Sequence, residues 1–392
     1  MQRKPLNDPN QKLQNIEGLR GLMALWVVAG HAATLAVLPL SPHGGIGRIL
    51  ANGSFAVDVF IIVSGFVIAL LLARQHESYG PFLVRRAFRL FPVYWVALLL
   101  SVLMLPLAIH FLEALPWHHE HNDVRLEIFA KTQDHFWTHL ALHVPLLHGL
   151  VPETLLPATG TAFIGQAWSL TLEWQFYLVA PLLPLVVNAA TRRTVWILVA
   201  VALSFAAATA VPQPSFLFAK LHLFAVGMIS HQLTQDLAAK RCTDGAFVRN
   251  LTLLGLLFVT QKALLIPWLI WMTTLCSQVL SQPRGYILTA VGKLLGHPVT
   301  CWLGRISYPV YCLHMVVLYL CGHALVNLLG VRSHVAYATT LLLAGPALTL
   351  ALAWLVHRTI EEPMIAIGKR LAGHRRRQPA DAVPATAAEE SV

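Results

Sequence analysis

Long apolar runs recur along almost the whole of this 392-residue chain, and they limit its possible folds more than any other feature. Most of them are long enough to cross a hydrocarbon layer of about 30 Å as an α-helix, which takes about 20 residues. Charged residues make up 12% of the chain, whereas soluble domains average about 25%. The sequence therefore predicts an all-α fold, a polytopic membrane helical bundle.

About ten membrane spans are predicted, with the N- and C-termini both on the inner side of a bacterial inner or plasma membrane. This placement puts 22 of the 28 Lys and Arg residues on the inner side and five on the outer side, with Lys220 inside a span. Such an excess of basic residues marks the cytoplasmic side of a membrane protein. The predicted spans are 17–40, 53–74, 90–112, 161–188, 194–211, 214–233, 249–261, 263–281, 301–329 and 334–358.

The net charge of +10 indicates anchoring at the inner leaflet of the lipid bilayer, and not binding of nucleic acid, for which the chain has no motif. The predicted organisation has three parts. They are a cytoplasmic N-terminal segment 1–16, a membrane domain 17–365 with an external loop 113–160, and a basic, then disordered, cytoplasmic tail 366–392.

The external loop is rich in histidine. His135, His139 and His143 fall at positions i, i+4 and i+8 of a possible amphipathic helix, and two such histidines can bind zinc. The alternative is an interfacial helix that lies on the outer leaflet. No acidic or cysteine partner stands at a familiar ligand spacing, so no metal site is predicted, and the five cysteines form no C-x-x-C pair.

The first span contains an arginine, Arg20, and a histidine, His31. Eleven helical steps of about 100° return to the same face, so the two side chains are stacked about 16 Å apart along one stripe. Asp58 lies in the second span, and a His31–Asp58 pair would fix the imidazole tautomer and raise its basicity, as a general base requires. The alternative is a snorkelling arginine together with a structural buried hydrogen bond.

A cluster of arginines, Arg85, Arg86 and Arg89, precedes the third span on the inner side. The planar guanidinium group suits phosphate and pyrophosphate. The alternative is ordinary anchoring of a span by basic residues. Because Arg20 also lies at the inner surface, below His31, we expect the cluster to hold a phosphate-bearing donor whose reactive end extends toward the histidine.

Polar groups in other spans point to the same interior. An unpaired carboxylate in lipid is costly, so Glu173 in the fourth span must meet a partner or a ligand hydroxyl. Tyr177 lies one helical turn after it, and Ser307 and Tyr311 share a helix face with His314. The polar residues expected to contact ligands are Ser64, Tyr177, Lys220, Tyr311 and His314.

Five segments, in this order along about 20–365, carry a resemblance to a known family: EGLRGLMALWVVAGH, VDVFIIVSGFVIA, RAFR, WSLTLEWQFY and GRISYPVYCLH. Together with the ten spans they resemble acyltransferase family 3, the integral-membrane O-acyltransferases. The resemblance implies a cytoplasmic acyl-CoA donor, usually acetyl-CoA, which is a co-substrate and not a tightly bound cofactor. It also implies an acceptor hydroxyl, often on a glycan, at the outer side.

The family motifs imply roles for particular residues. By their match, His31 would be the catalytic histidine and Arg20 its partner. Arg86 and Arg89 would be the R-x-x-R pair that handles the donor, and Glu173 falls on the motif carboxylate. Phe66 replaces a tyrosine that the family often shows, and no extracellular hydrolase-like domain follows the membrane part.

Acyl transfer to a hydroxyl needs a base for its proton and a positive or hydrogen-bonding group for the oxyanion. His31 would supply the base, and Asp58 and Glu173 are the acidic candidates for the catalytic machinery. Lys220 (where the family often shows arginine), Tyr311 and Ser64 are alternatives for the oxyanion, and the sequence does not choose among them.

Three other functions compete with a glycan O-acyltransferase. The same chemistry could act on a small-molecule or lipid acceptor. His31, Asp58 and Glu173 could instead relay protons in a proton-coupled exporter. A non-catalytic scaffold would leave these intramembrane ionisable groups without a purpose, and the alignment of the inner arginines with His31 favours the enzyme.

Overall fold

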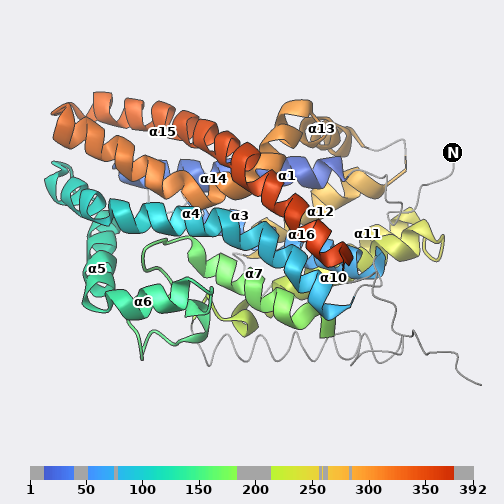
Figure 1. The fold of residues 1–392 in the computed structure, drawn as a ribbon. Helices are drawn as coiled ribbons and strands as arrows, with labels where there is room; N and C mark the ends of the chain where they lie inside the picture. Colours follow the sequence, from blue (N-terminus) through green and yellow to red (C-terminus); the bar gives the residue numbers. More distant parts are fainter. Residues whose placement is uncertain are drawn as a thin grey trace, which may run out of the picture.

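The computed structural model describes residues 13–38, 52–74, 78–182, 213–255, 258, 264–281 and 285–374. Every regular element within these ranges is a helix, so the all-α fold is confirmed for the described part of the chain (Figure 1). The first elements are α1 (Gln14–Leu35), α3 (Ser54–Arg74), α4 (Tyr79–Ala114), α5 (Glu120–Asp134), α6 (Phe136–His143), the 3₁₀ turn η1 (His148–Leu150), α7 (Ala167–Val179) and η2 (Ala180–Leu182).

The second half continues as helices and two π-helical turns. Its elements are α10 (Leu217–Ala238), α11 (Asp244–Gly255), α12 (Leu265–Val279), α13 (Tyr286–Leu295), α14 (Pro298–His323), the π turn η5 (Ala324–Leu328), α15 (His334–Val356), the π turn η6 (His357–Glu361) and α16 (Glu362–His374).

Among the described residues, five helices are long and apolar enough to cross a membrane: Gln14–Leu35, Ser54–Ala73, Tyr79–Ala114, Pro298–Leu328 and His334–Gly373. They match five of the predicted spans, but two of them extend further than expected. The third begins at Tyr79, and the last continues through η6 and α16 into the segment assigned to the tail. The predicted span 194–211 lies outside the described residues, and the count of ten and the orientation stay predictions.

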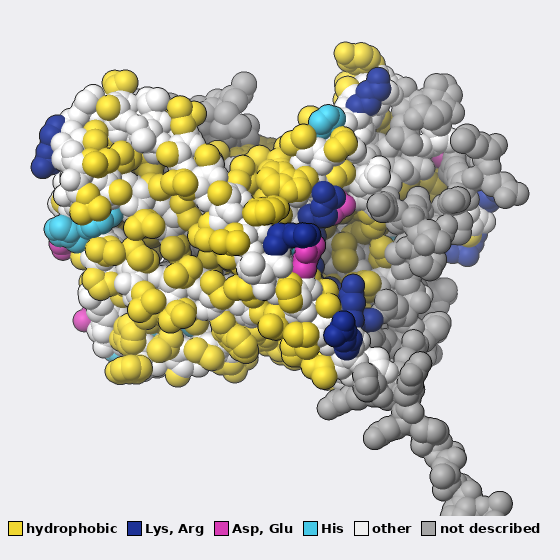
Figure 2. Space-filling view, turned by 45° about the horizontal axis from the view of Figure 1, so that its top comes forward, with side chains coloured by type: hydrophobic (Ala, Val, Ile, Leu, Met, Phe, Trp, Pro, Cys, Tyr) yellow, Lys and Arg dark blue, Asp and Glu magenta, His cyan; other side chains and the backbone are white. Residues whose placement is uncertain are grey.

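The outward face of the bundle is apolar. Large hydrophobic side chains on α4 and α15 are exposed, among them Leu99, Leu103 and Leu343 at 59%, 63% and 70%. Figure 2 shows hydrophobic side chains over most of the left part of one face, with a group of charged side chains near the middle of the view and others at its left edge. A soluble protein rarely exposes so much contiguous apolar surface, so this face belongs in hydrocarbon.

Glycines bring the central helices into direct backbone contact. A Cβ atom on Gly21 of α1 would lie 2.7 Å from the backbone nitrogen of Gly304 in α14, so the side chains of the two helices cannot separate them there. A Cβ atom on Gly227 of α10 would likewise lie 2.0 Å from the carbonyl oxygen of Ile62 in α3. Small residues allow this approach, which gives membrane helices the packing contacts that the hydrophobic effect does not supply in lipid.

The histidine-rich segment 113–160 is two helices and a return loop, and the possible helix through His135, His139 and His143 is present as α6, with His135 at its N-cap. His135 separates α5 from α6, which ends at His143. The rings of His143 and His148 are stacked, with centroids 3.9 Å apart and planes 6° from parallel. Parallel rings do not aim their lone pairs at one ion, and no metal-holding group of three or more His, Cys, Asp or Glu occurs among the described residues.

The glycine contacts predict that Gly227→Ala destabilises the protein. Its Cβ would overlap the Ile62 carbonyl, and forcing extra atoms into packed cores costs about 1–3 kcal/mol. Thermal unfolding of the purified protein in detergent should show a lowered midpoint. Gly245→Ala is the matched control, because nothing lies within 4 Å of its Cβ position. Equal midpoints for the two variants would contradict the contact.

The stacked histidines predict lower stability in acid. Burial lowers the pKa of His143 to about 4 and the pKa of His148 well below its ordinary value. An unfolded histidine titrates near about 6.5, so below that pH the unfolded chain binds protons that the folded one excludes. Stability is therefore complete above about pH 6.5 and falls as the pH drops toward 4.

The measurement is the unfolding midpoint between about pH 7 and about pH 5. His148→Phe keeps an aromatic ring in the stack but cannot be protonated, so it should flatten the decline. His118→Gln is the control, because His118 is 75% exposed and should leave the decline unchanged. An unchanged decline in His148→Phe would show that other groups cause the acid sensitivity.

Candidate active site

A cavity of about 460 Å³ opens inside the bundle, and residues of seven helices line it. On α3 the lining extends from Val57 to Leu71, a length of about 21 Å along the helix. We call one end the basic end, and it is lined by Arg20, Arg85, Arg86, Arg89 and Lys369. We call the other the far end, and it is lined by Val57, Phe60, Ser169 and Tyr311.

Three helices bring the cations of the basic end together. Arg20 comes from α1, Lys369 from α16, and the three other arginines from the early turns of α4, a helix that begins at Tyr79 and not at the predicted residue 90. Among the described side chains that line the cavity, Glu173 is the single carboxylate. The predicted meeting of Arg20 with the arginine cluster is therefore present, and the cavity carries an excess of positive charge that suits a polyanion.

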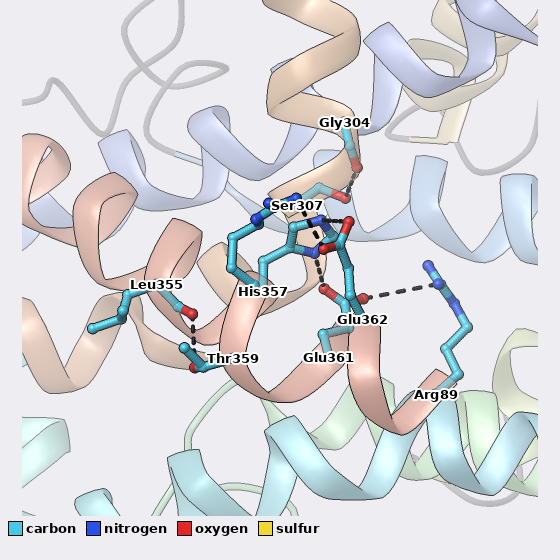
Figure 3. A network of polar contacts seen from close by, with 9 residues as sticks. Arg89, Gly304, Ser307, Leu355, His357, Thr359, Glu361 and Glu362 are labelled. Atoms are coloured by element: carbon cyan, nitrogen blue, oxygen red, sulfur yellow. Dashed lines mark hydrogen bonds and ion pairs between the residues drawn. The ribbon is translucent and has the colours of Figure 1, made fainter. Parts of the chain in front are cut away.

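A buried carboxylate that the sequence did not indicate, Glu361, holds one of these cations. Its Oε1 lies 3.8 Å from Nη1 of Arg89, and the Glu361 side chain is 1% exposed. The other oxygen, Oε2, lies 2.6 Å from Nδ1 of His357, whose Nε2 lies 3.4 Å from Glu362. Figure 3 shows Arg89 reaching from α4 toward Glu361 beside this chain of contacts.

The π turn η6 explains why the sequence pattern did not indicate Glu361. The stretch HRTIEEP, residues 357–363, overlaps the end of the last predicted span, where adjacent acids ordinarily indicate a solvated helix end. A π turn inserts an extra residue into the helical repeat and so rotates the next helical turn, and such turns are frequent at functional sites. Here it places Glu361 inside and leaves Glu362 47% exposed.

Midway along the cavity, three predicted site residues meet. The hydroxyl of Tyr177 donates a hydrogen bond to Oε1 of Glu173, and the hydroxyl of Ser64 reaches the same oxygen at 3.5 Å. The guanidinium carbon of Arg86 lies 5.8 Å from the centroid of the Tyr177 ring, over its face. Glu173 thus has the partners that a carboxylate in lipid requires.

The far end is built on a hydrogen-bonded link between α7 and α14. The hydroxyls of Ser169 and Tyr311 are 2.7 Å apart, and the Tyr311 hydroxyl donates to the carbonyl of Gln166 at 3.1 Å. The Gln166 amide donates to the carbonyl of Cys312 at 2.9 Å. Gln166 was not among the predicted site residues, although its polar amide inside an apolar run is a signal that could have indicated it.

His31 lies beyond the far end and is not one of the residues that line the cavity. Its ring centroid is 5.2 Å from that of His314, which is 6.0 Å from that of Tyr311. Nδ1 of His314 is 2.8 Å from the Tyr311 carbonyl oxygen. Because a carbonyl only accepts, Nδ1 carries the proton, and Nε2 is a buried acceptor without a hydrogen-bond partner among the described residues.

A cation of the segment 113–160, Arg125, is linked to the backbone of His31 through Thr34. Nη2 of Arg125, on α5, donates to Oγ1 of Thr34 at 2.8 Å, and Thr34 donates to the His31 carbonyl at 3.0 Å. Nη1 of Arg125 donates to Asn122 at 2.6 Å. No pattern in the sequence associates Arg125 with His31, because the two lie in different helices and far apart along the chain.

The predicted His31–Asp58 pair is wrong. Oδ1 of Asp58 accepts a hydrogen bond from Nζ of Lys220 at 2.8 Å, and the Asp58 side chain is 5% exposed. An ammonium group compensates a buried carboxylate better than a neutral imidazole does. Because Lys220 is engaged here and does not line the cavity, it is also a poor candidate for the oxyanion.

The three residues of the alternative proton relay, His31, Asp58 and Glu173, each contact a different partner. Asp58 meets Lys220, Glu173 meets Tyr177 and Ser64, and His31 meets His314. A relay needs consecutive groups within hydrogen-bonding reach, so the exporter alternative loses the arrangement on which it depended.

Apolar helices of membrane-spanning length around a basic cavity define an integral membrane protein. The comparisons with known proteins identify the family of membrane proteins to which the chain belongs. The acyltransferase-domain model of acyltransferase family 3 matches residues 13–358, so the chain belongs to this family and is an acyltransferase that transfers groups other than aminoacyl groups.

Two curated proteins are similar to this chain, and one of them is named an acyltransferase. The acyltransferase MdmB of Streptomyces mycarofaciens is 28% identical over an alignment of 412 positions, which covers 97% of each chain. Protein 2 in the picA locus of Rhizobium radiobacter is 34% identical over 96 residues, which are 24% of this chain and 45% of that protein. No solved structure matches.

The Asp58–Lys220 pair predicts that Lys220→Met destabilises the protein through the carboxylate it leaves unpaired. Removing one partner of a buried pair costs about 3–5 kcal/mol, and the 21% exposure of Lys220 places the effect at the lower end. The double variant Asp58→Leu, Lys220→Met should recover most of the loss in unfolding midpoint. A double variant no more stable than Lys220→Met would contradict the pairing.

Proposed function

We propose that this protein is an O-acyltransferase that moves an acyl group from cytoplasmic acyl-CoA to the hydroxyl of an acceptor, with His31 as the general base. One observation carries the proposal. A cavity that is strongly basic at one end extends about 21 Å along α3 and stops one side chain short of the His31–His314 pair.

The basic end suits the phosphates of coenzyme A. Arginine binds phosphate oxygens with two parallel hydrogen bonds, and Arg20, Arg86 and Arg89 converge there from two helices. The length of the cavity suits the extended pantetheine arm, which would bring the thioester to Tyr311 and Ser169. Following the family resemblance, we propose acetyl-CoA as the donor.

The reaction follows from the order of these groups. His31 takes the proton of the acceptor hydroxyl, and the oxygen forms a bond to the thioester carbonyl carbon. A hydroxyl of the Tyr311–Ser169 pair donates to the oxyanion of the tetrahedral intermediate. The carbon–sulfur bond then breaks, and the departing coenzyme A thiolate takes the proton from His31.

We propose that the acceptor arrives from the side of α5, opposite the donor. Arg125 lies on that side of His31 through its contact with Thr34. With the basic end in the cytoplasm, the acyl group would cross the membrane while coenzyme A stays inside. A cell-surface or exported carbohydrate is the acceptor that this arrangement favours, with the protein in the bacterial inner membrane.

The decisive experiment measures acetyl-CoA consumption by the purified protein with a panel of glycans and of small hydroxylated compounds. His31→Ala should lower transfer by about 10²- to 10⁴-fold, the usual contribution of a general base, without changing the unfolding midpoint. His118→Ala, in the exposed part of the external segment, should keep full activity. Near wild-type transfer by folded His31→Ala would reject the assignment of the base.

A further inference from the structure

Helix α16 forms one wall of the cavity. Glu361, the last residue of the π turn η6, and Ile365 and Lys369 of α16 fall at positions i, i+4 and i+8, and so on one helical face. Glu361 contacts Arg89, and Ile365 and Lys369 line the cavity directly. All three residues lie beyond 13–358, the range that the family model matches, so the family assignment gives this face no role.

The position of this wall is fixed by close packing on α4. A Cβ atom on Gly368 would lie 2.6 Å from Cβ of Phe88, so α16 and α4 touch beside the cavity. The contact of Arg89 with the buried Glu361 holds the other end of the same interface. Lys369 is therefore attached to the cavity by a rigid helix and does not belong to a loose tail.

Lys369 lies nearer the mouth than the deeper arginines. It is eight residues after Glu361, about 12 Å further along the helix, and its side chain is exposed where that of Glu361 is buried. Arg85 lies one turn before Arg89 on α4, and it also lines the cavity. The basic end thus has an inner group of four arginines, Arg20, Arg85, Arg86 and Arg89, which are partly buried, and an outer cation, Lys369, which is exposed.

An inner group of arginines and an outer lysine match a donor that carries two separate anionic groups. Coenzyme A has a pyrophosphate next to its pantetheine arm and a phosphomonoester on its ribose. A phosphomonoester carries about 1.5–2 negative charges at neutral pH, and a lysine ammonium binds such a point of charge without requiring the planar geometry of arginine. The inner group is closer to the far end, so the pyrophosphate belongs there and the phosphomonoester at the mouth.

We propose that Lys369 binds the ribose 3′-phosphate of the donor and makes the protein select coenzyme A over its 3′-dephospho form. The proposal rests on the proposed acyl-CoA donor. It assigns a binding role to a residue that the sequence pattern alone places in the cytoplasmic tail.

The test compares acetyl-CoA with acetyl-3′-dephospho-CoA on the purified full-length protein. For the wild type, removing the phosphate should raise KM about tenfold, the scale of one hydrogen bond between charged groups. Lys369→Gln should raise KM for acetyl-CoA by a similar factor, leave KM for the dephospho donor unchanged, and leave kcat unchanged with both. Lys369→Arg should keep the preference for the phosphorylated donor.

Arg370→Gln is the matched control, because it removes a neighbouring cation of the same helix that does not line the cavity. It should keep the wild-type preference, whereas a general effect of net charge would lower it as much as Lys369→Gln does. Equal losses for both donors in Lys369→Gln, or a wild type without preference, would overturn the role of Lys369 alone. A wild type that neither binds coenzyme A in titration calorimetry nor consumes acetyl-CoA would overturn the proposed donor as well.

Discussion

The backbone contact between α1 and α14 decides what Arg20 and His31 of the first helix meet. Gly21 and Gly304 let these helices touch without intervening side chains. Packing at that distance puts His31 beside His314 and leaves Arg20 to line the cavity between α14, α3 and α4. Charged and polar groups in a membrane bundle are tolerated where they face a cavity or one another, and this contact provides both situations on one helix.

The positive charge of the cavity explains where the buried carboxylates lie. A basic cavity needs some compensation when no ligand is bound, yet a close carboxylate on every cation would compete with a phosphate. Glu361 lies 3.8 Å from Arg89, and Glu173 is engaged by Tyr177 and Ser64. Asp58, the buried carboxylate of α3, is engaged by Lys220 and does not line the cavity.

His31 has two kinds of neighbour. His314 and Tyr311 connect its ring to the cavity, and Thr34 and Arg125 connect its backbone carbonyl to the segment 113–160. His31 therefore has access to two different sets of partners. The helix α16 completes the cavity side, although most of it lies past residue 365, where the sequence pattern ends the membrane domain.

The sequence by itself determined what depends on spacing within one helix. The apolar runs determined the all-α fold, the 3.6-residue repeat placed Tyr177 one turn from Glu173, and the motifs indicated the family. Only the tertiary structure decided which helices face each other. It gave Asp58 to Lys220 instead of His31, and it brought Glu361 and Lys369 to the arginines. The reason is physical, because the helical repeat fixes neighbours along one helix, whereas neighbours across helices depend on rotation and close packing, here set by glycines and a π turn.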